Sequence, residues 1–381
     1  MNAKPKILHV FKTALPETEG GIPHVMDMLA RGLKDRFEPS FLIASNASSS
    51  VFEVGGVIRH HLVRHIGHAF SMPIAPGFPF RLAKLAHEHD MIALHMPFPL
   101  ADLATWFGSF AAKPLVVHWH SEIVRQRGFR WLYDRPVRAT LARADAVIVS
   151  GDRLLAGSPY LKAIPEKCHA IPFGVDTGLW NGLSQEERLA CEETRRKHPR
   201  LVLGVGRLVS YKGFHVLIEA MRDVDGELWI AGDGPLSEFL KERAGGMLKS
   251  GKVRFLGRVE RSQLKHLYHS AAVFAFSPVT EAEAFGLVQL EAMCCGLPVV
   301  NTALATEVPI VARDGIEAVT VSPEDAGALS AALSALLDDP QRRAAMGAAG
   351  WQRAREEYDA ERFVQRVGDI YTQALAARQP S

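Results

Sequence analysis

The chain has 381 residues, of which 48% are hydrophobic and 23% charged, and its net charge is +2. This length suits about two soluble globular domains, and the composition excludes a disordered, collagen-like or disulfide-stapled protein. The four cysteines form no Cys-x-x-Cys pair and no apolar run reaches the roughly 20 residues of a membrane span, which favours a cytoplasmic protein.

Short apolar strands alternate with helical segments along the chain, which predicts parallel sheets. The first strand follows the N-terminus almost directly, so we expect no signal peptide. The expected strands of the first half are 6–11, 41–44, 57–63, 91–95, 115–119, 146–149 and 168–171. The expected strands of the second half are 201–205, 227–231, 253–256, 273–276, 298–301 and 318–321. The expected helices include 23–34, 185–197, 214–221, 326–337 and one long amphipathic helix at 351–375.

This pattern predicts an α/β fold of two doubly wound domains, whose ligands gather beyond the carboxyl ends of the strands. A turn-rich step at 172–176 gives domains at 1–175 and 176–355, followed by a C-terminal helix at 356–381. Arginines alternate with aromatic residues between Arg125 and Arg143. That segment is either an ordinary solvated helix or an anionic interface such as a membrane surface, and no nucleic-acid motif accompanies it.

A glycine pair, Gly20 and Gly21, follows the first expected strand. Paired glycines let the backbone approach a ligand closely, and Pro23 suits the first position of a helix. The pair predicts a diphosphate cradle, and a plain tight turn is the alternative. The third glycine of a dinucleotide-binding fingerprint is missing, so that motif is not predicted.

Two histidines, His118 and His120, stand at the end of the strand expected at 115–119. Both histidines could be metal ligands. His118, which lies within the strand, could instead be a structural side chain. Because no acidic or histidine partner stands at metal-ligand spacing, we predict no metal site.

In the second domain, Arg207 and Lys212 follow the strand expected at 201–205. Five residues apart across a strand–loop–helix junction, they can converge on one diphosphate, the arginine as a planar fork and the lysine as a point charge. Arg258 and Val259 follow a later strand among turn residues. Taken alone, both pairs are also compatible with ordinary exposed loops.

The segment from Glu283 to Glu291 places two carboxylates eight residues apart around Phe285, Gly286 and Leu287. A short helix is expected from Gly286, and its free N–H groups and positive dipole end form an anion site. Glu291 then lies roughly 8 Å along the helix axis, while Glu283 stays in the preceding loop. The arrangement suits a sugar, a diphosphate and a ribose in a row, although solvated helices also carry glutamates at this spacing.

This segment resembles the Glu-x7-Glu signature of family 4 glycosyltransferases, which are retaining nucleotide-sugar enzymes of the GT-B fold. The glycine pair, the histidine string and the Arg-x4-Lys pair occur in the family's order. The string around His118 and His120 resembles bacterial mannosyl- and rhamnosyltransferases of lipid-linked polysaccharide assembly. The resemblance implies two Rossmann-like domains facing an interdomain cleft, with the last helix crossing back to the N-terminal domain. Ala284 departs from the Pro or Gly often found there.

The resemblance also implies a role for each candidate residue. Arg207 and Lys212 are expected to stabilise the leaving diphosphate. Glu283 is expected to bind the sugar hydroxyls and His120 to orient the sugar. The other expected donor contacts are Gly20, Gly21, Phe285, Gly286 and Leu287, with Glu291 on the ribose and Arg258 and Val259 beside the base. No metal or other cofactor is expected, because two cations and a helix end supply the charge and no Asp-x-Asp motif is present.

The expected reaction is transfer of a hexose, best from GDP-mannose, to a hydroxyl of a glycan or a polyprenyl-diphosphate-linked acceptor. The alternatives are a transferase with a UDP-hexose donor and a sugar-nucleotide 2-epimerase; a phosphorylase-like enzyme and a non-catalytic sugar-binding protein are further rivals. The basic segment between Arg125 and Arg143 predicts peripheral contact with the inner face of the cytoplasmic membrane. No nucleic-acid partner is expected.

Overall fold

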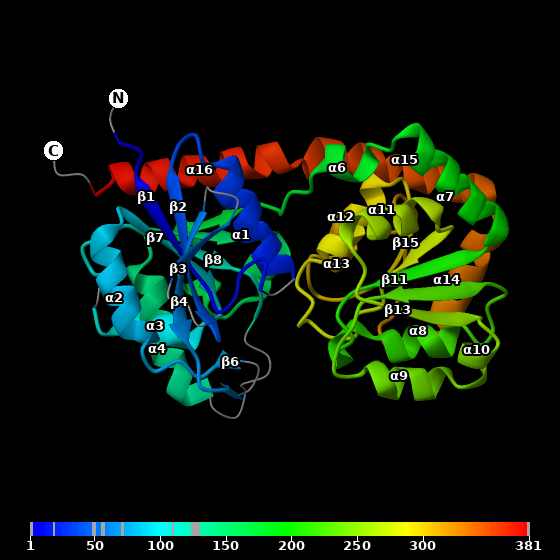
Figure 1. The fold of residues 1–381 in the computed structure, drawn as a ribbon, viewed down its shortest axis with the longest axis horizontal. Coiled ribbons are helices and arrows are strands. Elements are labelled where there is room, and N and C mark those ends of the chain that lie inside the picture. Colours follow the sequence, from blue (N-terminus) through cyan, green and yellow to red (C-terminus); the bar gives the residue numbers. More distant parts are fainter. Residues whose placement is uncertain are drawn as a thin grey trace. The chain divides into compact units, whose positions relative to one another are not determined.

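The computed structural model describes residues 3–17, 20–47, 51–54, 58–69, 72–108, 110–122 and 130–378. The chain divides into two compact units, each built around one sheet (Figure 1). The N-terminal unit combines Met1–Gly174 with Ala360–Ser381, and the C-terminal unit is Val175–Asp359. Two α/β units with mostly parallel sheets confirm the predicted fold class.

The sheet of the N-terminal unit has the strand order β10-β9-β8-β7-β1-β2-β4-β3. Every described pair in it is parallel except β3 with β4, and that antiparallel edge strand was not predicted. The strands are β1 (Lys6–Val10), β2 (Glu38–Ser45), β3 (Val51–Val54), β4 (Ile58–Arg64), β7 (Met91–Met96), β8 (Leu115–Trp119), β9 (Ala146–Val149) and β10 (Cys168–Ala170). A separate small ribbon pairs β5 (His68–Ala69) with β6 (Met72–Pro73).

Helices cover both faces of this sheet, which is why β7, β8 and β9 are buried along their whole length. On one face, α1 (Gly21–Gly32) packs against α16 (Ala360–Ala376). The other face carries α2 (Phe78–Glu88), α3 (Pro99–Trp106) and α4 (Arg130–Arg143), in that packing order (Figure 1). The short helix α5 (Asp152–Gly157) packs beside β9 and β10.

The sheet of the C-terminal unit is parallel in every described pair, with the order β13-β12-β11-β14-β15-β16. Its strands are β11 (Leu201–Val205), β12 (Glu227–Ala231), β13 (Val253–Gly257), β14 (Val273–Ala275), β15 (Val299–Thr302) and β16 (Ala318–Val321). The helices α8 (Phe214–Ala220), α9 (Ser237–Ala244) and α14 (Ala326–Asp338) pack around one core, with α10 (Gly246–Lys249) beside α9. The remaining helices are α6 (Thr177–Asn181), α7 (Gln185–Lys197), α11 (Arg261–Ser270), α12 (Leu287–Cys294), α13 (Val308–Val311) and α15 (Pro340–Glu357).

Each sheet has one point at which the direction of winding reverses. In the N-terminal unit this switch point lies between β1 and β7, and in the C-terminal unit between β11 and β14. In open α/β sheets, ligands bind beyond the carboxyl ends of the strands at such a point, because the loops there diverge and leave a crevice. The topology therefore selects the loops after β1, β7, β11 and β14 as candidate binding elements.

Two sequence predictions about helices are wrong. The single helix expected at 351–375 is two helices, because α15 ends at Glu357 and α16 begins at Ala360. The carbonyl of Tyr358 accepts a hydrogen bond from the Val175 N–H at 2.8 Å, so the backbone leaves the helical path there. In addition, α1 begins at Gly21, which makes Pro23 its third residue and not its first. Among the described helices, none is long and apolar enough to cross a membrane.

Candidate active site

Lys212 lies on the loop that follows β11, at the switch point of the C-terminal unit. The next residue, Gly213, has a φ of 69°, and a Cβ atom there would lie 1.8 Å from the carbonyl oxygen of Ser277. Only glycine fits this close approach. The Val279 N–H also donates to the Tyr211 carbonyl at 2.8 Å. The loops after β11 and β14 are thus in direct contact with each other.

The same two loops are joined by an ion pair between Lys212 and Glu283. The Lys212 Nζ and Glu283 Oε2 atoms are 2.6 Å apart, and the two side chains are only 12% and 11% exposed. Burial lowers the pKa of Lys212, but the ion pair and hydrogen bond with Glu283, with smaller contributions from Tyr211 and Glu291, outweigh it and the net pKa is raised. Lys212 is therefore a fixed cation, and its Nζ also lies 5.2 Å from the ring centroid of Phe276.

The sequence predicted separate ligands for these two residues, and the structure brings them into contact with each other. A buried ion pair gives little net stability, because desolvation of both charges offsets their attraction. Its value here is positional, since each charge holds the other at the carboxyl edge of the sheet. Arg207, also predicted, is exposed on the same loop, and its side chain has no hydrogen bond or ion pair with the residues that the structure describes.

The N-terminus of α12 directly follows Glu283. Gly286 precedes the helix with a φ of 81°, and a Cβ atom on it would lie 2.6 Å from the ring of Phe276. Among the described residues no side chain caps this end, so backbone N–H groups of the first turn, starting at Leu287, remain available to a ligand. The predicted anion site thus has its backbone donors close in sequence to the Lys212–Glu283 pair.

Two buried amides that the sequence analysis missed hold this loop in place. Gln289 and Asn301 are both completely buried. The Gln289 Nε2 donates to the Phe285 carbonyl at 3.3 Å, and its Oε1 accepts from the Asn301 Nδ2 at 2.9 Å. A buried amide is retained only where its hydrogen bonds are satisfied. A polar residue on the inner side of an otherwise apolar helix was the available signal.

Glu291 occupies the next turn of α12, where Tyr268 on α11 donates to its Oε2 at 2.8 Å. Burial raises the pKa of Glu291 from 4.5 to about 7, and the Tyr268 hydrogen bond opposes this rise only in part. Tyr268 itself is fully buried and was not predicted. The second carboxylate of the motif therefore binds a proton at a higher pH than an exposed glutamate does.

Arg258 and Val259 follow β13, on the outer side of the sheet but at the same carboxyl edge. Arg258 is exposed and Val259 partly so. The loop is anchored because the Gly257 carbonyl accepts from the Gly232 N–H at 2.7 Å. The structure thus places both residues at the edge where the sequence expected them.

In the N-terminal unit, the predicted residues lie after β1, which borders the switch point, and on or directly after β8, which is the strand next to β7. Gly20 and Gly21 are exposed at the start of α1, where the Gly20 carbonyl accepts the His24 N–H at 3.1 Å. His118 forms a 2.7 Å hydrogen bond between its Nε2 and the Tyr371 hydroxyl, which matches the structural alternative. His120 follows β8, is 5% exposed and is hydrogen-bonded to another histidine. Within the described residues, no three His, Cys, Asp or Glu side chains meet as a metal site.

The basic segment predicted as an anionic interface is described only in part. Arg125 and Arg127 lie outside the described residues. Arg143 is 3.2 Å from Asp145 and also donates to the Lys113 carbonyl, so its charge is engaged within the unit. Two further side chains of this segment are also engaged within the unit: Tyr133 donates to the buried Asp102, and Arg138 pairs with Asp134 at 2.7 Å. Arg135, in contrast, is exposed.

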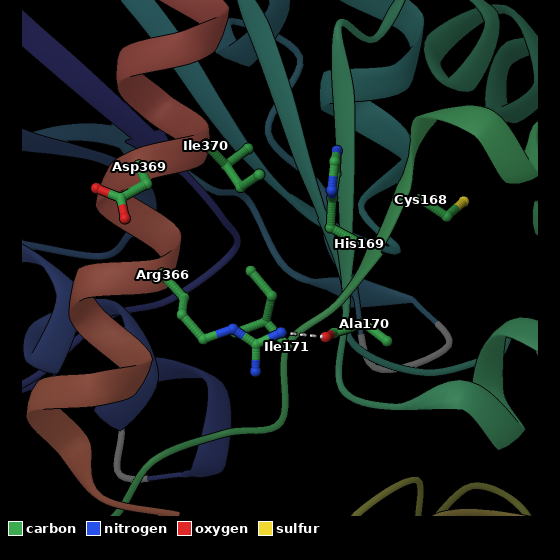
Figure 2. A pocket seen from close by; sticks show the side chains of 7 residues that line it. All are labelled: Cys168, His169, Ala170, Ile171, Arg366, Asp369 and Ile370. Carbon is green, nitrogen blue, oxygen red and sulfur yellow. Dashed lines mark hydrogen bonds between the residues drawn. The ribbon is translucent and has the colours of Figure 1, made fainter.

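A surface pocket of the N-terminal unit lies between β10 and α16 (Figure 2). It contains no predicted site residue. Two of its charged side chains are already engaged, because Arg366 donates to the Ala170 carbonyl at 2.9 Å and Asp369 pairs with Arg36 at 3.0 Å. We assign no ligand to this pocket.

The raised pKa of Glu291 predicts a pH dependence of stability. Between about pH 4.5 and pH 7 the folded chain holds a proton that the unfolded chain has released, so the wild-type free energy of unfolding falls as the pH rises. Glu291→Gln has no titrating carboxyl group at this position. Its stability relative to wild type is expected to increase by about 2–3 kcal/mol between pH 5 and pH 8, measured by urea unfolding.

Tyr268→Phe serves as the matched variant. It removes the hydrogen bond that favours the charged carboxylate and should move the midpoint of the wild-type pH profile upward. A stability difference between wild type and Glu291→Gln that stays constant over this pH range would contradict the assignment.

Comparison with known proteins agrees with this geometry. The model for "Glycosyltransferase Family 4" matches residues 19–179, and that for "Glycosyl transferases group 1" matches residues 186–353. The chain is 29% identical over 364 residues to the D-rhamnosyltransferase WbpZ of Pseudomonas aeruginosa, covering 93% of this chain and 92% of that protein. It is 26% identical over 380 residues to the O-antigen chain mannosyltransferase C of Escherichia coli, covering 98% and 100%.

Among solved structures, sucrose-phosphate synthase from Thermosynechococcus elongatus has the same fold. The TM-score is 0.79 at 22% identity, and the match covers 98% of this chain and all of that one. The two family models match the two halves of the chain, and the relatives match nearly its whole length. The chain therefore belongs to the family 4, group 1 glycosyltransferases and is a glycosyltransferase of the GT-B fold.

Proposed function

We propose that the protein is a retaining glycosyltransferase that moves a hexose from a nucleotide sugar, best GDP-mannose, to a hydroxyl of a glycan or lipid-linked glycan. One observation carries the proposal. At the switch point of the C-terminal unit, the Lys212–Glu283 pair, the exposed Arg207 and the uncapped start of α12 belong to adjoining loops. Fixed positive charge next to free backbone donors suits a diphosphate.

In this proposal, the chemistry depends on stabilising the diphosphate as it leaves. Arg207 and Lys212 bring positive charge, and the first turn of α12 contributes N–H dipoles. Such preorganised groups act most strongly where water is excluded, and Lys212 is nearly buried before any ligand arrives. Two cations and a helix end supply the charge that Mg²⁺ supplies elsewhere, so we propose a metal-independent reaction.

Glu283 and Glu291 have different roles in the proposal. One oxygen of Glu283 is engaged by Lys212, which leaves the carboxylate able to accept hydrogen bonds from sugar hydroxyls. Glu291 would accept the ribose hydroxyls beside Tyr268. Binding two hydroxyl donors favours the ionised form of Glu291, so nucleotide binding should lower its pKa. Arg258 and Val259 would border the base.

The stereochemical part of the proposal is retention at the anomeric carbon. In retaining members of this family the acceptor is thought to attack from the side of the leaving group, so no protein nucleophile is required. The acceptor proton then passes to the departing phosphate, beside Lys212. His120 is proposed to orient the donor sugar, and Gly20 and Gly21 to approach its phosphate or sugar.

The choice of donor draws on the names of the relatives. One acts as a D-rhamnosyltransferase and another as an O-antigen chain mannosyltransferase. Both names support a hexose donor of the manno series and an acceptor in polysaccharide assembly. A UDP-hexose donor and a 2-epimerase activity are the alternatives, and incubation of donor alone separates the epimerase, because only that enzyme converts donor without acceptor.

Thermal unfolding with GDP, UDP, ADP and dTDP in metal-free buffer tests the donor site. A nucleotide at about 100 times its dissociation constant adds roughly 2.7 kcal/mol to stability. This should raise the Tm by several degrees for one nucleotide, expected to be GDP. The shift should be lost in Glu291→Ala and retained in the exposed control Glu238→Ala. No shift with any of the four nucleotides would contradict a nucleotide-sugar enzyme.

A lipid-linked acceptor would require contact with the inner face of the cytoplasmic membrane. Support comes from an exposed aromatic pair, Trp106 and Phe107, whose rings stack 5.9 Å apart at the end of α3. Their exposed fractions are 49% and 77%. Aromatic side chains of this kind insert at the headgroup level, and α3 packs on α4, which carries the exposed Arg135.

Vesicle sedimentation tests this contact with phosphatidylglycerol and phosphatidylcholine vesicles. Binding is expected only to the anionic vesicles, should weaken with salt, and should fall about tenfold in the double variant Trp106→Ser, Phe107→Ser. Phe239→Ser, which replaces an aromatic residue 50% exposed on α9, is the control. Equal affinity of the double variant and wild type would remove the aromatic pair from the proposal.

A further inference from the structure

Four buried histidines meet at the switch point of the N-terminal unit. His9 lies in β1, His95 in β7 and His118 in β8, and His120 directly follows β8. Their exposed fractions are 1%, 0%, 2% and 5%. Histidine is intermediate in its tendency to be buried, so four at one place need hydrogen-bond partners to be retained.

Three of these histidines form a continuous hydrogen-bonded row. The His9 Nδ1 is 3.1 Å from the His95 Nε2, and the His95 Nδ1 is 2.8 Å from the His120 Nε2. The rings lie edge to edge along the row and are close to parallel, with centroids 5.4 and 5.1 Å apart and interplanar angles of 27° and 6°. His95 thus uses both nitrogens, one toward each neighbour.

All three rings are neutral at physiological pH. Burial lowers the pKa of His9 and of His120 to about 3, and burial together with the neighbouring histidines lowers the pKa of His95 well below its ordinary value. A neutral imidazole carries one N–H group and one lone pair. Every ring in the row is therefore a donor on one side only.

This restriction gives the row a direction. If His9 donates from Nδ1, His95 accepts at Nε2 and must donate from Nδ1, so His120 accepts at Nε2 and carries its proton on Nδ1. If His120 donates from Nε2 instead, the same reasoning puts the proton on Nε2 in all three rings. Any mixed arrangement sets two N–H groups or two lone pairs against each other.

The free end of the row is the Nδ1 atom of His120. It is buried and has no hydrogen-bond partner among the residues that the structure describes. An unpartnered buried nitrogen of this kind marks a place where a ligand atom can complete the hydrogen bonding. His118 stands outside the row, because its Nε2 is bonded to the Tyr371 hydroxyl on α16.

We propose that His9 and His95 are positioning residues that hold His120 in one tautomer, the same in all three rings, with the His120 Nδ1 offered to the ligand. The inference rests on the proposed function only in taking that ligand to be the donor sugar. The tautomer decides whether His120 donates to a sugar oxygen or accepts from a sugar hydroxyl. Two residues with no predicted role in the reaction thereby set the hydrogen bond that His120 makes.

Nitrogen-15 NMR of the full chain with labelled histidine tests the row directly, because protonated and unprotonated ring nitrogens have well-separated shifts. We expect His9, His95 and His120 to show the same tautomer at pH 7.5. The control Tyr371→Phe removes only the partner of His118 and should leave the three tautomers unchanged. A ring of opposite tautomer within the row would overturn the proposal.

Substitution at the far end of the row gives the second measurement. His9→Phe removes the partner of His95, so the His120 nitrogen shifts should change and kcat should fall about tenfold or more, with KM little altered. His9→Asn keeps a polar atom near the position of Nδ1, so its His120 nitrogen shifts and its kcat should be close to those of wild type. Unchanged His120 nitrogen shifts in a folded His9→Phe variant would overturn the proposal. If that variant does not fold, the nitrogen shifts of His9→Asn and the tautomers of the wild-type rings provide the test.

The spectra need neither donor nor acceptor. A common tautomer in a protein that transfers no sugar would count against the proposed function and in favour of the row. An active glycosyltransferase whose three rings differ in tautomer would count in favour of the proposed function and against the histidine row.

Discussion

The proposed site depends on the ion pair between Lys212 and Glu283, because it ties together the two loops that diverge at the switch point of the C-terminal unit. Gly213 lets these loops touch, since its Cβ position is filled by the Ser277 carbonyl. A buried pair of this kind contributes little to stability, and removing one partner leaves an uncompensated charge. Its cost is reasonable at a binding site, where a fixed cation and a fixed carboxylate need no reorganisation when a charged ligand arrives.

The two units share one feature: buried polar side chains in the interior of the unit form hydrogen bonds that hold a proposed site element in place. In the C-terminal unit, Asn301 holds Gln289, and Gln289 holds the backbone before α12. In the N-terminal unit, His9 and His95 stand behind His120 in the same way. Buried polar networks make a site rigid as their members become satisfied, and a ligand atom on the His120 Nδ1 would complete the histidine row. The supporting groups are therefore as specific to the site as the residues facing the ligand.

The sequence predicted the strands well, because buried strands of parallel sheets are apolar throughout and end at polar or glycine residues. The helix α7 was predicted at its observed bounds, and the structure adds that Ser184 and Glu187 form a capping box at its start. The break at Tyr358 could not be predicted: the amphipathic pattern continues across it, and its cause is a hydrogen bond to the distant Val175. The site residues were found at strand ends, but contacts such as Tyr268 with Glu291 join elements whose register only the fold determines.

The steady-state rate of sugar transfer by Lys212→Met tests the central claim most directly, with Lys241→Met as the control. Lys241 also pairs with a glutamate, at 2.7 Å from Glu238, but on the exposed face of α9. If Lys212 stabilises the leaving diphosphate, Lys212→Met should lose about 100-fold or more in kcat/KM while remaining folded by circular dichroism, and Lys241→Met should not. A folded Lys212→Met that keeps its activity within about threefold of wild type, a difference of roughly 0.7 kcal/mol, would contradict the account.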